Sequence, residues 1–162
     1  MIYKVIGAIG VFAASSAIGL IKSAQLGARV KFLESMSDAL LVLETEISAA
    51  LTPLPLAMER AARAQPLFGK AAGYMHSGLC ADEAFLKALE ETEYEESERG
   101  ALESFASGLL APDCEGQLKN IALCRARILN ILHASSEKKD KLEKVYSGCG
   151  ALGGIAAVIL LI

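Results

Sequence analysis

The stretch VKFLESMSDALLVLETEISAALTPLP, residues 30–55, determines how the chain folds. Its apolar positions, with a few polar ones among them, recur at alternating spacings of three and four, which predicts one stripe along an α-helix. The stripe consists of Val30, Leu33, Ser37, Leu40, Glu44, Ile47 and Leu51. Pro53 and Pro55 end this helix and fit the first turn of the next one, where backbone N–H groups have no intrahelical partner. We expect Thr52 to cap that second helix.

Helical patterns and proline boundaries continue through the rest of the middle region. A second helix is expected to end near Gln65, a third to cover residues 67–75, a fourth to begin near Asp82 and a fifth to reach Phe105. From Pro112 onward no proline interrupts the chain, and a second stripe predicts a long last helix. That stripe consists of Leu118, Ile121, Arg125, Ile128 and Leu132. No run typical of strands occurs. The predicted fold is an all-α, antiparallel bundle of about six helices.

Two uncharged, apolar segments flank the charged middle region. Residues 5–21 and 145–162 contain no charged residue, and the mean hydropathy of the chain is +0.40. Helices of this length come close to crossing a hydrocarbon core of ~30 Å. We expect transmembrane helices within residues 1–21 and 145–162, continuous with the first and last helices of a middle domain at residues 22–144. The alternatives are a cleaved signal peptide at one end and a buried core helix at the other.

Positive charges set the expected orientation. Seven lysines and arginines flank the apolar segments on the middle side, and only Lys4 lies on the far side. By the positive-inside rule, the middle domain faces the cytoplasm and both termini lie outside. Pairs of small residues at helical spacing let helices approach closely in lipid and predict self-association. They are Ser15 with Gly19 and Gly150 with Gly154. The general frequency of glycine and alanine in membrane helices is the alternative explanation.

Composition and motifs argue against catalysis, metal binding and nucleic-acid binding. The formal net charge is −3, and a mildly acidic chain is a poor partner for nucleic acid. The four cysteines form no CxxC pair, so neither a zinc site nor a disulfide framework is predicted. His76 and His133 are far apart in sequence, and no glycine-rich phosphate loop follows a strand. We therefore expect no enzyme activity, no cofactor and no metal.

Several charged residues are candidates for structural or partner contacts. Glu44 interrupts the apolar stripe of the first long helix, where an unpaired carboxylate would be costly, and Arg125 interrupts the stripe of the last one. Either the two form a buried pair inside the bundle, or Glu44 faces a partner protein. Residues 90–99 (EETEYEESER) contain six glutamates and are expected to form an exposed junction between helices. Its candidate contact residues are Glu93, Glu95 and Glu96.

Two blocks of sequence resemble the stage III sporulation protein AB family of endospore-forming bacteria. The first is residues 43–47 (LETEI) followed by residues 52–57 (TPLPLA), which adds Glu46 to the candidate contact residues. The second begins at residues 105–108 and continues at Asp113, Glu115, Gly116, Gln117 and Lys119. The order of apolar segment, helical middle and apolar tail matches as well, so the resemblance covers the whole chain. Ala111-Pro112 departs from the cap expected in this family.

The resemblance implies a fold and a function. The family is similar in its helical domain to the F-type inner-membrane platform proteins of type II secretion and type IV pilus machines. It implies a structural part in a secretion-like complex of the mother-cell membrane around the forespore. The implied partners are the lipid bilayer, a secretion-type ATPase and other membrane proteins of the complex. F-type proteins usually carry two such domains, whereas this chain has one. A membrane-tethered scaffold or signalling bundle unrelated to secretion is the alternative function.

Overall fold

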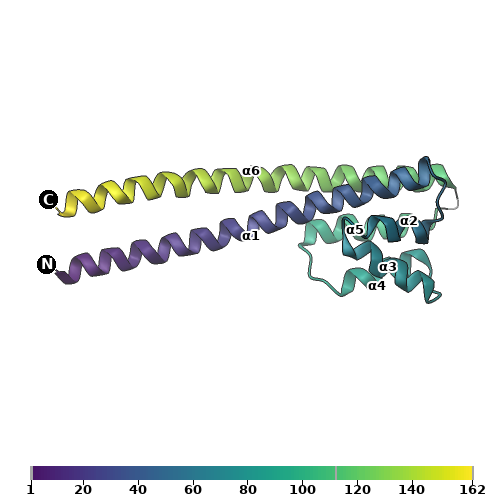
Figure 1. Cartoon of the computed structure of the whole chain (residues 1–162), viewed down its shortest axis with the longest axis horizontal. Coiled ribbons are helices and arrows are strands. Elements are labelled where there is room, and N and C mark those ends of the chain that lie inside the picture. The colour runs from purple at the N-terminus through teal and green to yellow at the C-terminus, as the bar shows by residue number, and fades with distance from the viewer. Residues whose placement is uncertain (1, 112, 162) are drawn as a thin grey trace. The chain divides into compact units, whose positions relative to one another are not determined.

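The computed structural model describes the backbone of residues 2–111 and 113–161. It describes side-chain surroundings within residues 23–111, 113–142 and 144–145. The described backbone forms six α-helices and no strand (Figure 1). The helices are α1 (Ile2–Ser48), α2 (Leu54–Ala61), α3 (Pro66–His76), α4 (Ala81–Glu90), α5 (Glu96–Gly108) and α6 (Cys114–Leu161). The prediction of an all-α chain is confirmed.

The helices belong to two compact units. One consists of residues 1–31 and 133–162, and the other of residues 32–132. The predicted membrane spans, except for Val145, lie outside the residues whose side chains are described, and so do the small residues proposed for self-association. Those small residues are Ser15, Gly19, Gly150 and Gly154. Among the described residues, no helix combines the length and the apolar character needed to cross a membrane.

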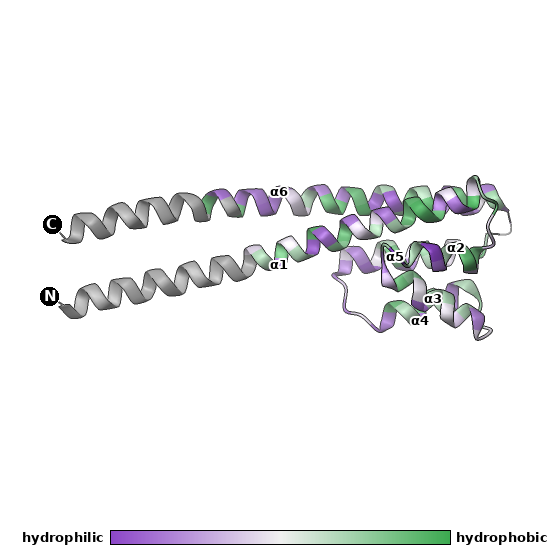
Figure 2. Cartoon of the chain, in the orientation of Figure 1, coloured by the Kyte–Doolittle hydropathy of each residue, from purple (hydrophilic) through white to green (hydrophobic). Residues whose placement is uncertain are grey.

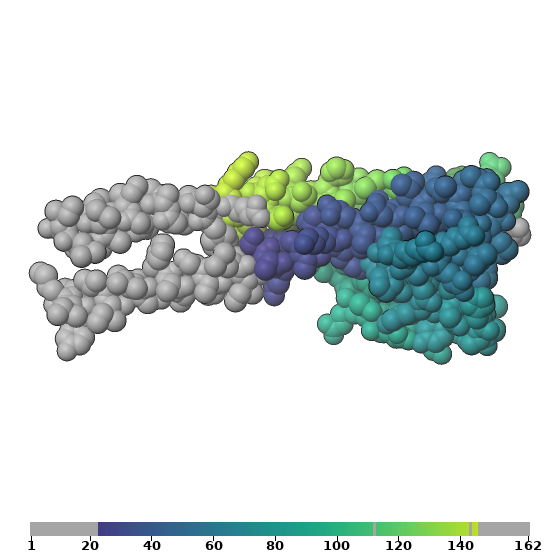
Figure 3. All heavy atoms as spheres, in the orientation of Figure 1, coloured from purple at the N-terminus to yellow at the C-terminus, as the bar shows by residue number. Residues whose placement is uncertain are grey.

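The unit of residues 32–132 has a hydrophobic core to which all six helices contribute. At its centre are Phe68 of α3, Phe85 of α4 and Phe105 of α5, all fully buried. Their ring centroids lie 5.1 to 6.3 Å apart in edge-on arrangements, a geometry that aromatic rings favour. The described parts of α1 and α6 carry both hydrophobic and hydrophilic residues (Figure 2), and the atoms of residues 32–132 lie against one another on the face that Figure 3 shows.

The buried stripe of α1 differs from the predicted one. Leu43 is fully buried, whereas Glu44 lies at the edge of the stripe and is half-buried. In a helix of 3.6 residues per turn, the positions that face the core lie along one side of the helix, and Leu43 rather than Glu44 falls at the centre of that side. The core-facing positions are Leu33, Met36, Leu40, Leu43 and Ile47. The helix ends at Ser48, so Leu51 falls beyond it and is 79% exposed instead of buried.

The start of α2 is only partly as predicted. Pro55 lies in the first turn, as expected, but Pro53 occupies the N-cap position, and no side chain caps the helix. The prediction that Thr52 caps α2 is therefore wrong. Its hydroxyl donates instead to the carboxylate of Glu46 on α1, at 2.8 Å.

A glycine allows α5 and α6 to approach closely. A Cβ atom on Gly108 would lie 2.3 Å from Cγ of Asn120, far inside van der Waals contact. The Asn120 amide in turn donates to the carbonyl oxygen of Phe105 at 2.8 Å, satisfying a carbonyl near the end of α5. Asp113 Oδ2 accepts the backbone N–H of Gly116 at 2.8 Å and so caps the start of α6.

Candidate docking surfaces

Glu46 connects the two halves of the first family-like block. Its carboxylate accepts hydrogen bonds from the Thr52 hydroxyl and from the guanidinium of Arg60 on α2. Its backbone carbonyl accepts the N–H of Thr52 at 3.0 Å. The Glu46 side chain is 19% exposed, so these contacts fix the corner between α1 and α2. Glu46 and Thr52 therefore stabilise the fold at this corner.

A surface groove lies beside this corner. It has a volume of 660 Å³ and is lined by Val42 and Glu46 of α1, Arg60 of α2, and Arg63 and Ala64 of the turn that follows. The charge of Glu46 is engaged by Thr52 and Arg60, whereas the side chain of Arg63 makes no hydrogen bond or ion pair with the described residues. The groove therefore combines small apolar walls with one unpaired positive charge.

Glu44 and Arg125 meet, but at the surface. Arg125 Nη1 lies 3.9 Å from Glu44 Oε2, and the two side chains are 32% and 36% exposed. The deep burial considered for this pair is not observed, because Leu43 takes the core-facing position. The Nε atom of Arg125 is buried and makes no hydrogen bond among the described residues. The pair joins α1 to α6 but leaves part of each charged group in solvent.

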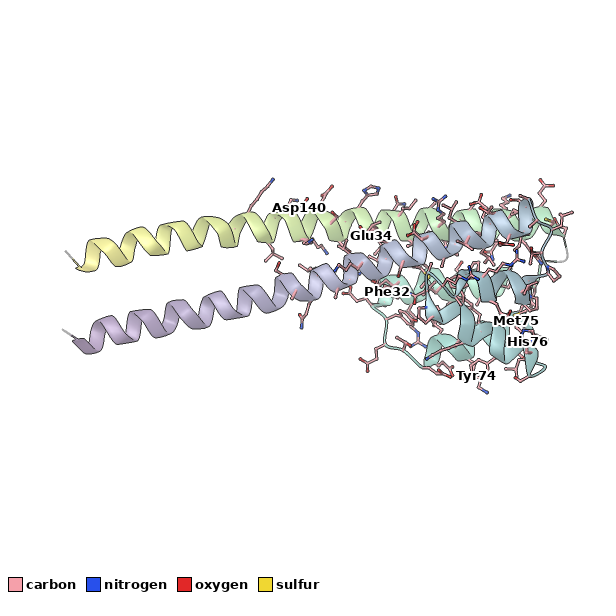
Figure 4. All side chains as sticks on the ribbon, viewed as in Figure 1. Phe32, Glu34, Tyr74, Met75, His76 and Asp140 are labelled. Atoms are coloured by element: carbon pink, nitrogen blue, oxygen red, sulfur yellow. The ribbon has the colours of Figure 1, made fainter. Side chains whose placement is uncertain are left out.

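The acidic segment, which we define as residues 90–96, connects α4 to α5 and is held at its start by α3. Glu91 lies 2.7 Å from Lys70 Nζ and also accepts a hydrogen bond from the Tyr74 hydroxyl. Tyr74, which Figure 4 labels, belongs to α3. The hydrogen bond from Lys70, and to a lesser extent that from Tyr74, lowers the pKa of the Glu91 carboxyl. Lys87 Nζ lies over the Tyr74 ring, 4.5 Å from its centre. The segment is thus tied to α3 by one of its own carboxylates.

A second contact holds the acidic segment against α1. Tyr94 is half-buried, and its ring centroid lies 5.5 Å from that of Phe32. Burial raises the pKa of the Tyr94 hydroxyl. Between the two anchors, the chain exposes Thr92 and Glu93 to solvent. The backbone of the segment is therefore held at both Glu91 and Tyr94.

The glutamates of this region have different roles. Glu93 and Glu96 are exposed and make no hydrogen bond or ion pair with the described residues. Glu95 is the N-cap of α5 and forms a capping box with Glu98. Glu98 is only 4% exposed, which corrects the expectation that residues 90–99 are all too charged to be buried. Glu93 and Glu96 remain available for a partner.

The other reactive side chains serve local contacts. His76 Nε2 lies 2.6 Å from Glu59 Oε1 and so links α3 to α2. Cys80 and Cys114 are exposed, and Cys124 is buried, which raises the pKa of its thiol to about 12. Within the described ranges, no group of three or more His, Cys, Asp or Glu residues could hold a metal ion.

Several of these contacts could not be read from the sequence. Arg60 reaches Glu46 across 14 positions, and no periodic spacing connects the two residues. The anchoring of Tyr94 on Phe32 joins still more distant positions. Only Glu98 carried a local signal, because a carboxylate three residues after a polar N-cap is the pattern of a capping box.

Comparison with known proteins shows to which family the chain belongs. A sequence model of the stage III sporulation protein AB family matches residues 4–162. A solved structure of a stage III sporulation protein AB matches with a TM-score of 0.61 and 22% sequence identity, over 68% of this chain and 94% of that one. At this identity, the structural likeness shows the fold alone. A comparison with curated protein sequences finds no match.

Proposed function

Because the chain belongs to the stage III sporulation protein AB family, we propose that it is a non-catalytic membrane component of a secretion-like complex in endospore formation. In this role it docks a cytoplasmic secretion-type ATPase at the mother-cell membrane that faces the forespore. The family supports the sporulation role. Anchoring and docking are supported by the sequence and by the surfaces described above.

Two properties of the sequence support membrane anchoring. Residues 5–21 and 145–162 carry no charge, and lysines and arginines gather on the side of the middle domain. Such segments partition into hydrocarbon, and the positive-inside rule directs the middle domain to the cytoplasm. Close approach at Ser15, Gly19, Gly150 and Gly154 would let the spans associate with one another or with those of a second copy.

The observation that carries the docking proposal is the pair of unpaired carboxylates on the acidic segment. Glu93 and Glu96 are exposed, and the contacts of Glu91 and Tyr94 hold the chain around them. A backbone that is already held in place loses little conformational freedom when a partner binds. Complementary charge also speeds association. A basic surface on a cytoplasmic protein fits this segment, and the family resemblance makes the secretion-type ATPase the partner.

Binding between the purified full-length chain in detergent and the ATPase of the same organism tests this proposal. Affinity should fall as salt rises from about 50 to 500 mM, because exposed charges are screened over about 10 Å at 0.1 M and over less at higher salt. The double variant Glu93→Gln, Glu96→Gln should bind roughly 2- to 30-fold more weakly at low salt, as expected for two exposed ion pairs. Glu95 is left unchanged because it caps α5.

A matched control keeps the change of charge but moves it elsewhere. The variant Glu34→Gln, Asp38→Asn removes two exposed carboxylates from α1 and should bind like the wild type. Both double variants should unfold at the wild-type temperature. If the folded wild-type chain does not bind the ATPase at low salt and high concentration, the docking proposal is wrong. If both double variants weaken binding equally, net charge and not the acidic segment is responsible.

A further inference from the structure

Leu51 is held in an unfavourable backbone conformation at the corner between α1 and α2. Its φ angle is 50°, and among the described residues it is the one residue other than glycine with a positive φ. A side chain crowds the backbone in this region, which is why glycine or asparagine usually occupies it. The Leu51 side chain is 79% exposed, so it gains little from burial in the chain itself. The conformation turns the chain at the end of α1, where the N–H of Thr52 reaches the carbonyl of Glu46, while the Leu51 side chain projects into solvent.

The neighbours of Leu51 fix it in place. The N–H of Thr52 donates to the carbonyl of Glu46, and the Thr52 hydroxyl donates to the Glu46 carboxylate. Pro53, at φ −57° and ψ 143°, then starts α2. A strained residue persists only where its surroundings over-determine it, and such residues concentrate at sites of function. The backbone at Leu51 is therefore fixed, and its side chain is held exposed to solvent.

The corner between α1 and α2 presents apolar and positive groups at the surface. Leu56, Arg60 and Arg63 follow one another at spacings of four and three, and all are exposed. Leu56 is 43% exposed, and beside the arginines lies the groove walled by Val42 and Ala64. Since Glu46 is engaged within the fold, Arg63 supplies an unpaired positive charge. We define these residues as the corner surface; they are Val42, Leu51, Leu56, Arg60, Arg63 and Ala64.

We propose that the corner surface is a second docking site, at which Leu51 is the apolar anchor for an acidic segment of the ATPase. The inference rests on the proposed function, and charge complementarity selects the occupant. Because Arg60 is already paired with Glu46, the charge of Arg63 favours a carboxylate, whereas Glu93 and Glu96 favour positive groups. Two sites of opposite sign allow the ATPase to bind in one orientation and penalise the reversed one.

Leu51→Gly provides the test, because it separates stability from binding. Glycine adopts a positive φ freely, so the full-length variant should unfold at a higher temperature than the wild type. It loses the apolar anchor, so its affinity for the purified ATPase should fall roughly 10- to 100-fold, as expected for exposing one leucine side chain. Leu51→Met keeps an apolar side chain of similar size and should bind nearly as well as the wild type.

Salt and charge variants identify the chemistry of the contact. The factor by which Leu51→Gly weakens binding should be the same at about 50 and 500 mM salt, because apolar contacts are not screened. The factor for Glu93→Gln, Glu96→Gln should shrink. Arg63→Glu should weaken binding, and Arg63→Lys should largely preserve it. The control is Leu123→Gln, which removes a leucine of α6 that is 52% exposed and lies outside both surfaces.

Each outcome decides between the proposals. If the wild type does not bind the ATPase, the proposed function fails and this inference fails with it. If the wild type binds and Leu51→Gly binds equally well, the inference is wrong and the docking function stands. Weaker binding together with a lower unfolding temperature also overturns the inference, since damage to the fold would then explain the loss. Weaker binding with a higher unfolding temperature supports it.

Discussion

Glu44 and Arg125 form an ion pair whose contribution to stability is reduced by its exposure to solvent. The closest atoms are 3.9 Å apart, and about a third of each side chain is exposed, so water screens the attraction. We expect Glu44→Ala to lower the free energy of unfolding by less than about 1 kcal/mol, well below the roughly 3–5 kcal/mol expected for breaking a buried pair. Denaturant unfolding of the full-length chain measures this. A loss of about 3 kcal/mol or more would show that the pair is buried in solution.

Cys124 should differ from the other described cysteines in reactivity. Its thiol is buried between α5 and α6 and has a pKa of about 12, so almost no thiolate forms at pH 8. In a Cys149→Ser chain, a thiol reagent should modify Cys80 and Cys114 within minutes and Cys124 only after unfolding. Mass spectrometry of the labelled peptides checks this. Rapid labelling of Cys124 in the folded chain would contradict its burial.

At the scale of the elements, the packing of α5 on α6 depends on Gly108. A methyl group there would overlap the Asn120 side chain, whose amide bonds the carbonyl of Phe105. Gly108→Ala should therefore destabilise the chain by about 1–3 kcal/mol, the usual cost of overpacking. Gly100→Ala is the matched control in the same helix, because a Cβ atom at position 100 meets nothing within 4 Å. It should be neutral or stabilise by about 0.5–1 kcal/mol. Equal effects at the two sites would refute the packing argument.

The sequence predicted the helices well because their limits are local. Prolines at positions 53, 55 and 66 and the long stripes of α1 and α6 place most boundaries within a few residues. The end of α1 was misplaced because Leu51 continues the apolar spacing although its backbone has left the helix. Glu98 was expected at the surface because the high charge of residues 90–99 was given more weight than the capping-box spacing of Glu95 and Glu98.

The candidate surfaces were predictable in composition but not in geometry. The exposure of Glu93 and Glu96 was expected from charge density, which did not distinguish them from the buried Glu98. The division between free, anchoring and capping glutamates depends on Lys70, Tyr74 and Phe32, which lie far away in sequence. The corner surface depends on Arg60 reaching Glu46 and on one backbone angle at Leu51, and no periodic pattern reports either.

At the scale of the whole molecule, the expected topology places the middle domain in the cytoplasm. The exposed thiols of Cys80 and Cys114 are natural probes for this. In intact cells that carry the Cys149→Ser chain, a membrane-impermeant maleimide should leave both unlabelled. After permeabilisation it should label both. Labelling of either residue from outside would overturn the orientation inferred from the lysines and arginines.

The central claim is that this chain holds a secretion-type ATPase at the membrane. The most direct measurement is the fraction of the ATPase that sediments with membranes from sporulating cells. With the wild-type chain, most of the ATPase should sediment. With no chain, the ATPase should shift to the soluble fraction. With Glu93→Gln, Glu96→Gln at normal chain levels a smaller share should shift, because two exposed ion pairs contribute only part of the affinity. An ATPase that sediments equally in all three strains would contradict the claim.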